Sequence, residues 1–478
     1  MNTSQTSIFA PILKTRSARN LGLFFVSLWL LAALALLALP LFPWWLFLVF
    51  MATTIISLVF AQFPKLIIYL MAVFYPFIGW YVVVGQINAP LIDFIGLFGV
   101  TGFVLRILIF SITDRTKITA WHWWGLLFFT AFGTVSLISA LLTDIVPVLS
   151  SLYYVVRTII FFYFAFVFVP LNILKNKNFL NRIFWIIYTL GIGISFYALF
   201  GFLQGILSSA LPNRALPLPI FGISPFGQNH NLIAEMMLVT VPIGLYLLSL
   251  AKDKFAQKLL FAGIILMAVA NLFTFSRTGW LALFLQLFLF LVLQYRGHFQ
   301  RVFRYVLLLF IVLLPLALYM FYFSFFSNIV LSSNQSRLFL NEVTWDMFME
   351  NPIFGSGPNT FMARLAQNPI YVMEFGEPLD AHGFLQKTFS ETGILGMLSF
   401  VALLVYVIYT VGRIYLQARH SKNYQLSFLV LTMLLLVSGS IFAELFQPNY
   451  YSPKLWFPLG VALAAVFFAQ EKLKEKNP

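Results

Sequence analysis

Residues 21–39 read LGLFFVSLWLLAALALLAL and contain no charged residue. About twenty consecutive apolar residues in a helix match the hydrocarbon thickness of a bilayer, so this stretch predicts a membrane span. Thirteen further apolar stretches follow it, at 44–61, 65–84, 90–110, 121–142, 147–170, 183–207, 231–250, 258–275, 279–295, 303–326, 391–413, 424–445 and 455–470. We therefore expect an all-α, polytopic membrane protein with 12–14 transmembrane helices, the lower numbers applying if prolines and glycines break the third and fourth spans.

The composition excludes several other classes of protein. Of the 478 residues 61% are hydrophobic and only 9% are charged, which is too apolar for a soluble domain. No small-residue cleavage site follows the first apolar run, so we expect it to stay as a span rather than to be removed as a signal peptide. Cysteine is absent from the sequence, which excludes disulfides, thiol catalysis and cysteine metal sites.

Basic residues concentrate in every second connection between the predicted spans. These connections hold 22 of the 29 Lys and Arg residues. Positive charge marks cytoplasmic loops, so it explains the net charge of +14 without a nucleic-acid partner and places both termini in the cytoplasm. The expected organisation is a cytoplasmic tail, a bundle of spans, an extracytoplasmic loop, further spans and a second cytoplasmic tail, at 1–20, 21–327, 328–390, 391–470 and 471–478.

The seven other basic residues are expected at the outer face or in the outer half of the membrane. They are Arg157, Arg214, Arg277, Arg337, Arg364, Lys387 and Lys454. A cation at the centre of a membrane helix costs about 2.5–3.5 kcal/mol on insertion scales, so Arg157 needs a buried partner or an anionic ligand. The sequence offers Glu235 and Asp144 as partners.

The segment 328–390 is too polar to lie in lipid, and long loops often carry binding elements. It contains Arg337, a glycine motif from Gly355 to Gly357 that is typical of a turn, and the closing sequence Asp380-Ala-His-Gly-Phe-Leu-Gln386. Its His382 is a candidate general base, although a lone histidine is as well explained as a surface residue.

Two other breaks in the apolar pattern carry polar residues. Ser276-Arg277-Thr278-Gly279 places a guanidinium at a helix N-terminus, where free N–H groups favour phosphate, although an arginine there can also reach to the lipid headgroups. In the second break, Asn229 or Asn231 could cap the helix that follows, and His230 is either an interfacial histidine or a ligand. Glu235 falls on the same helix face as Asn231.

The order and spacing of four short blocks resemble the O-antigen ligase/polymerase superfamily of bacterial envelope proteins, over roughly residues 220–400. The blocks are Phe226–Ala234, Ser276–Gly279, Asn351–Gly357 and Ala381–Gln386, the last followed by Glu391-Thr392-Gly393.

This resemblance implies a GT-C-like membrane glycosyltransferase of lipopolysaccharide or polysaccharide biosynthesis. Such an enzyme transfers a glycan from an undecaprenyl-diphosphate carrier to an acceptor hydroxyl at the outer face of the bacterial inner membrane. The acceptor is a lipid A-core sugar in ligases, a growing glycan in polymerases and a protein in some relatives. The family's essential histidine maps onto His382 and its Ser-Arg-[Ser/Thr] arginine onto Arg277, while a second family arginine could be Arg214 or Arg157. Where many relatives have His-Asn, this chain has His382-Gly383.

The chemistry of the residues fits this reaction independently. A diphosphate leaves readily, so the reaction needs a base for the acceptor hydroxyl and cations for the phosphates. We therefore expect His382 to be catalytic and four arginines to bind diphosphate, namely Arg277, Arg214, Arg157 and Arg337. The supporting residues would be Asn229, Asn231, Glu235, Ser276 and Gln386.

No outward Asp-x-Asp and no His/Asp cluster at ligand spacing occurs in the sequence, so we expect neither a metal nor another cofactor. The expected partners are the lipid-linked glycan donor, a glycan, lipid or protein acceptor, and the bilayer. A polymerase of the same superfamily is the main alternative to a ligase. A transporter would place more ionisable residues near mid-membrane, and a scaffold protein would have no activity.

Overall fold

Besides residues 304, 318 and 322, the computed structural model describes residues 44–84, 87–110, 124–207, 214–220, 222–227, 229–295, 328–447 and 450–476. The span expected at 21–39 lies outside the described residues, as does nearly all of the span expected at 303–326.

Ten helices in the described chain are long and apolar enough to cross a membrane, or eleven if a bent pair counts as one span. This confirms an all-α, polytopic membrane protein. One span is continuous but changes its winding along its length, as α6 (Val148–Val155), η1 (Val156–Phe161), η2 (Phe164–Phe168) and α7 (Val169–Ile173). The other nine spans are α4 (Leu91–Phe110), α5 (Trp124–Leu142), α8 (Lys177–Leu207), α9 (Asn231–Leu250), α10 (Lys254–Phe273), α11 (Arg277–Gln294), α16 (Phe384–His420), α17 (Tyr424–Glu444) and α18 (Pro453–Lys476).

The straight span expected at 65–84 is wrong. Helix α2 (Trp44–Gln62) gives way to α3 (Pro64–Phe74) at a bend of 109°. Proline at the first position of α3 has no N–H to donate, so the preceding helix cannot continue through it. After α3 the chain forms an antiparallel hairpin of β1 (Tyr81–Val84) and β2 (Ile87–Pro90), as β-branched valines favour.

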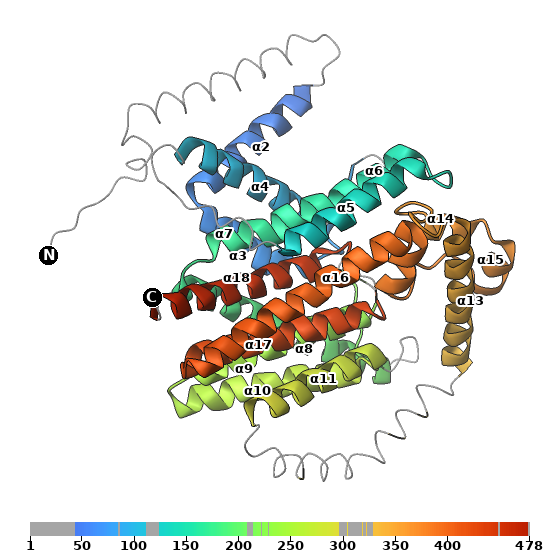
Figure 1. Cartoon of the computed structure of the whole chain (residues 1–478). Helices are drawn as coiled ribbons and strands as arrows, with labels where there is room; N and C mark the ends of the chain where they lie inside the picture. Colours follow the sequence, from blue (N-terminus) through green and yellow to red (C-terminus); the bar gives the residue numbers. More distant parts are fainter. Residues whose placement is uncertain are drawn as a thin grey trace.

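The spans share one apolar core, in which α9, α17 and α18 are the most buried spans. Helix α16 packs against α5, α17 and α18. Figure 1 shows α16, α17 and α18 running side by side, with α9 and α11 next to α17 and with α10 against α9. This packing fixes both ends of α16, so a residue at the start of α16 has a defined place at one end of the bundle.

The polar segment 328–390 contains three helices and a small core of its own. These helices are α13 (Asn328–Glu350), α14 (Phe361–Ala366) and α15 (Pro369–Phe375), and they lie at the end of the bundle beside the first part of α16 (Figure 1). Their core includes Leu340, Met347, Phe361, Tyr371 and Ala381. Because Ala381 belongs to this core, the sequence next to His382 is held by packing on α13.

Helix α16 is interrupted near its first third by Gly393, which has φ 63° and ψ −166°. A Cβ atom on Gly393 would lie 2.5 Å from the carbonyl oxygen of Ile353. The break lets the N–H of Ile394 donate to the carbonyl of Pro352 at 3.0 Å. Gly393 therefore joins the glycine turn after α13 to the helix that begins at the candidate site.

We expect Gly393→Ala to lower the thermal midpoint of the purified protein. The backbone there is in a region that only glycine adopts readily, which alone costs about 1–3 kcal/mol, and the new methyl group would meet a backbone oxygen. Gly412→Ala is the matched control on the same helix, since a Cβ there meets nothing within 4 Å. Equal midpoints for the two variants would contradict this account of α16.

Candidate functional site

His382 lies directly before α16, whose N-cap is Gly383. Its backbone N–H donates to Oε1 of Gln386 at 2.7 Å. The amide nitrogen of Gln386 in turn donates to Oδ1 of Asn341 on α13. Gln386, expected as a supporting residue, thus joins the backbone of His382 to α13.

Two guanidinium groups from other helices act on the imidazole of His382. Burial, Arg337 of α13 and Arg277 of α11 together lower the pKa of His382 to about 4, against a smaller opposing effect of Asp380. A positive charge nearby disfavours the imidazolium, and so does removal from water. His382 is therefore neutral near pH 7 and has a lone pair that can accept a proton.

A third guanidinium, that of Arg214, belongs to the same group of charges. Burial, Arg214 and Arg337 lower the pKa of His230 to about 3. The loop of Arg214 reaches this position because the N–H of Ala215 donates to the carbonyl of Phe273 at 2.7 Å, just before the Arg277 break. We call Arg214, Arg277, Arg337, His230 and His382 the arginine–histidine cluster.

The cluster combines positive charge with buried donors that the protein does not use. The Nε–H groups of Arg214 and Arg337 are both buried, and neither has a hydrogen-bond acceptor among the described residues. Burial lowers the pKa of Arg214, and burial together with the charge of Arg277 lowers the pKa of Arg337. Buried donors of this kind cost free energy unless a ligand satisfies them, and their charge selects an anion.

The Ser276–Gly279 break has the expected form. Ser276 is the N-cap of α11, and its Oγ accepts a hydrogen bond from the N–H of Gly279 at 3.1 Å. Arg277 is the first residue of the helix, so the positive end of the helix dipole adds to its charge. The supporting role of Ser276 is thus to begin α11 at the point where Arg277 joins the cluster.

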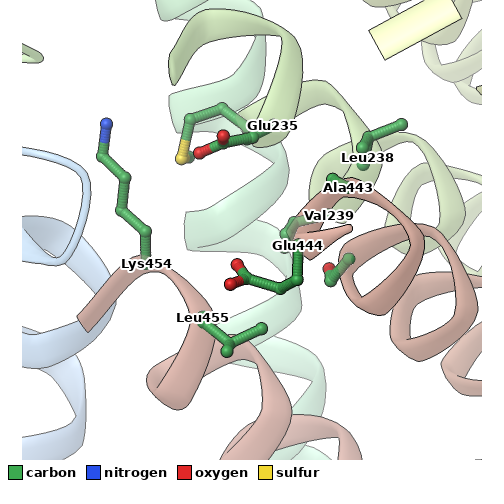
Figure 2. Close-up of a pocket in the computed structure, with 9 residues that line it drawn as sticks. Glu235, Leu238, Val239, Ala443, Glu444, Lys454 and Leu455 are labelled. Carbon is green, nitrogen blue, oxygen red and sulfur yellow. The ribbon is translucent and has the colours of Figure 1, made fainter. Parts of the chain in front are cut away.

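The polar residues expected to act with His230 lie in two places: Asn229 and Asn231 are at the start of α9, and Glu235 is farther along this helix. Asn229 makes a local turn, its Oδ1 accepting from the N–H of Asn231 at 2.9 Å, while the N-cap residue itself is His230. Glu235 lines a different cavity of about 20 Å³, which is room for about one water. Figure 2 shows Glu235 of α9 and Glu444 of α17 on two sides of this cavity, with Lys454 of α18 at its edge.

Arg157 is engaged away from the cluster. Its Nη2 lies 2.6 Å and its Nε 2.7 Å from Oδ2 of Asp93 on α4. The expected partners Glu235 and Asp144 were therefore wrong, because the π-helical winding of η1 and the packing of α4 bring Asp93 to this position instead. A buried ion pair accounts for Arg157 without a ligand.

The glycine motif from Gly355 to Gly357 is a turn and not a phosphate cradle. The N–H of Ser356 donates to Ser390 O at 3.0 Å, and the N–H of Gly357 donates to Glu391 O at 2.9 Å. These donors bind α16 and are not available to an anion.

Two ionised residues next to His382 were not expected to belong to the site. Lys387 of α16 donates to both carboxylate oxygens of Asp380, at 2.7 and 2.5 Å. Lys387 also lies 4.0 Å from Glu391, one turn along α16. The sequence does place an acidic residue, Asp380, before His382 and a basic residue, Lys387, after it, which could have indicated an ion pair. Only the fold shows that the side chain of Lys387 is buried.

The site thus defines a class: a multi-pass membrane protein with a cationic, imidazole-containing site at one end of its helix bundle. Residues 262–401 match the family model described as O-antigen ligase. The match spans α11, α13 and the start of α16, so it confirms the resemblance to the O-antigen ligase superfamily and indicates a ligase- or polymerase-type function. No curated protein matches the chain.

We expect the protein to lose thermal stability as the pH falls from about 6.5 to about 4. The folded-state pKa values of His382 and His230 lie below the ordinary value of 6.5, so the unfolded chain takes up protons first and acid favours unfolding. Each pKa unit is worth about 1.4 kcal/mol, so the full downward shifts of the two pKa values correspond to contributions on the order of 3–5 kcal/mol for each histidine.

The measurement is the thermal midpoint against pH for the protein in detergent. His382→Gln and His230→Gln should each flatten the acid limb, and His420→Gln, at the exposed end of α16, should leave it unchanged. An acid limb that is the same in all four proteins would contradict the electrostatic description of the cluster.

Proposed function

We propose that this protein transfers a glycan from an undecaprenyl-diphosphate carrier to an acceptor hydroxyl at the outer face of the bacterial inner membrane. The buried Nε–H groups of Arg214 and Arg337, which have no acceptor in the part of the chain that the structure describes, and the neutral imidazole of His382 carry this proposal. They offer hydrogen bonds and charge to an anion at the place where a base can take a proton.

His382 acts as the general base in the proposed reaction. The acceptor hydroxyl attacks the anomeric carbon of the donor glycan, the bond from that carbon to the diphosphate oxygen breaks, and His382 takes the hydroxyl proton. With no ligand bound, a pKa of about 4 makes His382 only a weak base. The negative charge of a bound diphosphate offsets Arg277 and Arg337, so it raises the pKa of His382 toward the working pH.

Arg277, Arg337 and Arg214 hold the diphosphate. Guanidinium groups present several N–H donors in a plane and keep their charge near neutral pH. In a partly desolvated site such groups stabilise the negative charge that grows on the leaving diphosphate, which is the transition-state interaction the reaction needs most. We assign Arg157, in contrast, a structural role with Asp93.

The α13–α15 region suits the glycan part of a substrate. An open groove of about 640 Å³ lies between α13 and the α14–α15 pair, within the size range of small-molecule sites. Its polar lining consists of Asp346, Glu350, Arg364, Gln367 and Asn368. Carboxylates, amides and a guanidinium supply both acceptors and donors for sugar hydroxyls.

Charge along the chain supports the outer orientation. The basic connections predicted to be cytoplasmic include those before α8, before α10 and after α16, whereas the cluster lies at the opposite ends of the spans that carry it. The carrier's diphosphate would meet the cluster at that surface, with its lipid tail in the bilayer.

We expect His382→Ala and Arg277→Met each to reduce glycan transfer at least about a hundredfold, because they remove the base and a diphosphate ligand. The assay is transfer from an undecaprenyl-diphosphate-linked glycan by purified protein, and EDTA should not reduce it. Lys472→Met, which removes the exposed ion pair with Glu475 at the end of α18, is the folded control. Normal transfer in both site variants would refute the assignment.

The envelope glycans of a strain that lacks this gene distinguish a ligase from a polymerase. We expect free glycan polymer of normal length to accumulate without being attached, which is the outcome for a ligase. Short, unpolymerised units attached to their usual acceptor would identify the polymerase alternative. The measurement is electrophoretic separation of envelope glycans from the deletion strain, with a strain carrying the His382→Ala gene as the matched control.

A further inference from the structure

Lys387 is a charged residue buried inside the protein next to the site. Its side chain is 3% exposed and contacts two carboxylates, Asp380 at 2.5 Å and Glu391 at 4.0 Å. A buried ammonium is stable only when it is paired and hydrogen-bonded. Both oxygens of Asp380 accept from Nζ, so hydrogen bonds from the segment that precedes His382 compensate this charge together with the carboxylate of Glu391.

Aromatic rings from two other elements enclose the ammonium. Nζ lies 4.7 Å from the ring centroid of Tyr451, in the connection before α18, and 5.5 Å from that of Tyr154 on α6. The ring faces attract a cation and keep water away from it. Lys387 therefore has one position in the fold, set by two nearby carboxylates and by two segments, those of Tyr154 and Tyr451, that are distant in the sequence.

The contacts of Lys387 join the two ends of the short segment that carries His382. Asp380 precedes His382 by two residues and Lys387 follows it by five, so the ion pair spans the imidazole. Inside the segment, the N–H of Lys387 donates to the carbonyl of Gly383 at 3.1 Å. A Cβ on Gly383 would lie 2.2 Å from the carbonyl oxygen of Leu445, so the end of α17 leaves no room for a side chain beside His382.

We propose that Lys387 is a positioning residue that, through Asp380, holds His382 beside Arg277 and Arg337. This inference rests on the proposed role of His382 as the base. The buried pair from Asp380 to Lys387 joins the segment that carries His382 to α16.

Loss of the ion pair between Asp380 and Lys387 has two expected effects that a simple loss of folding stability would not produce. The segment from Asp380 to Gly383 loses its main attachment to α16, so the imidazole moves away from the two guanidiniums. Its pKa then rises toward the ordinary value of 6.5. Donor binding, which depends on the arginines, stays near its wild-type strength while the turnover rate falls, because the base is misplaced.

Asp380→Asn is the decisive variant because two effects on His382 have opposite signs. If His382 stays in place, removing the Asp380 carboxylate lowers its pKa further, since that charge favours the imidazolium. If His382 leaves the guanidiniums, the pKa rises. Asparagine keeps the size of the side chain, and Lys387 keeps Glu391 as a partner, so the variant is expected to fold.

The test measures the reaction of His382 with diethyl pyrocarbonate as a function of pH, by peptide mass spectrometry on the full-length protein in detergent. This reagent modifies neutral imidazole, so the midpoint of the curve reports the pKa without any need for enzyme activity. We expect the midpoint to rise by about one pH unit or more in Asp380→Asn and in Lys387→Met. The control Lys472→Met breaks an exposed ion pair at the end of α18 and should leave the midpoint unchanged.

A midpoint that falls or does not move in Asp380→Asn overturns the proposal, whether or not Lys387→Met folds. In the transfer assay we expect kcat to fall at least tenfold with KM for the donor within about twofold of wild type. An equal rise in KM would instead mean that the pair supports the arginines. If the midpoint rises but His382→Ala still transfers glycan, the positioning role stands and the proposed function fails.

Discussion

Repulsion between the guanidinium groups of Arg277 and Arg337, together with the burial of Arg214 and Arg337, is the constraint on which the site depends. Like charges brought together in a partly desolvated region raise the free energy of the protein, and two of these groups also have buried Nε–H donors without acceptors among the described residues. Packing must hold such an arrangement together. An anion that binds there would offset the repulsion and accept hydrogen bonds from these donors, which is why the cluster favours an anionic ligand.

The fold supplies this packing through α16 and the small core of α13–α15. Helix α16 is fixed along its length by α5, α17 and α18, and its first turns are fixed by Asn341, Gln386 and the buried Lys387. Arg337 is carried on α13, which packs on the same part of α16. The imidazole and one guanidinium are therefore positioned by the same contacts, while Arg277 and Arg214 arrive through the hydrogen bond from Ala215 to Phe273.

The seven basic residues outside the predicted cytoplasmic connections differ in whether a carboxylate lies beside them. Arg157 with Asp93, Arg364 with Glu350 and Lys387 with Asp380 are ion pairs. In the cluster, by contrast, the nearest carboxylate to act on His382 is Asp380, which Lys387 already engages. The same residue types thus stabilise the fold in one place and leave a net positive charge in another.

The sequence by itself determined the class of protein, because twenty apolar residues in a row have only one stable environment. It also singled out His382, Arg277, Arg214 and Arg337 as candidates, since polar breaks between spans are few, and the structure brings these four residues into one cluster. Tertiary structure decided the partners: Arg157 meets Asp93 because of the winding of η1, the span after residue 64 bends into a hairpin, and Lys387 turns inward. Contacts between distant segments depend on how helices pack, and neither periodicity nor charge counting contains that information.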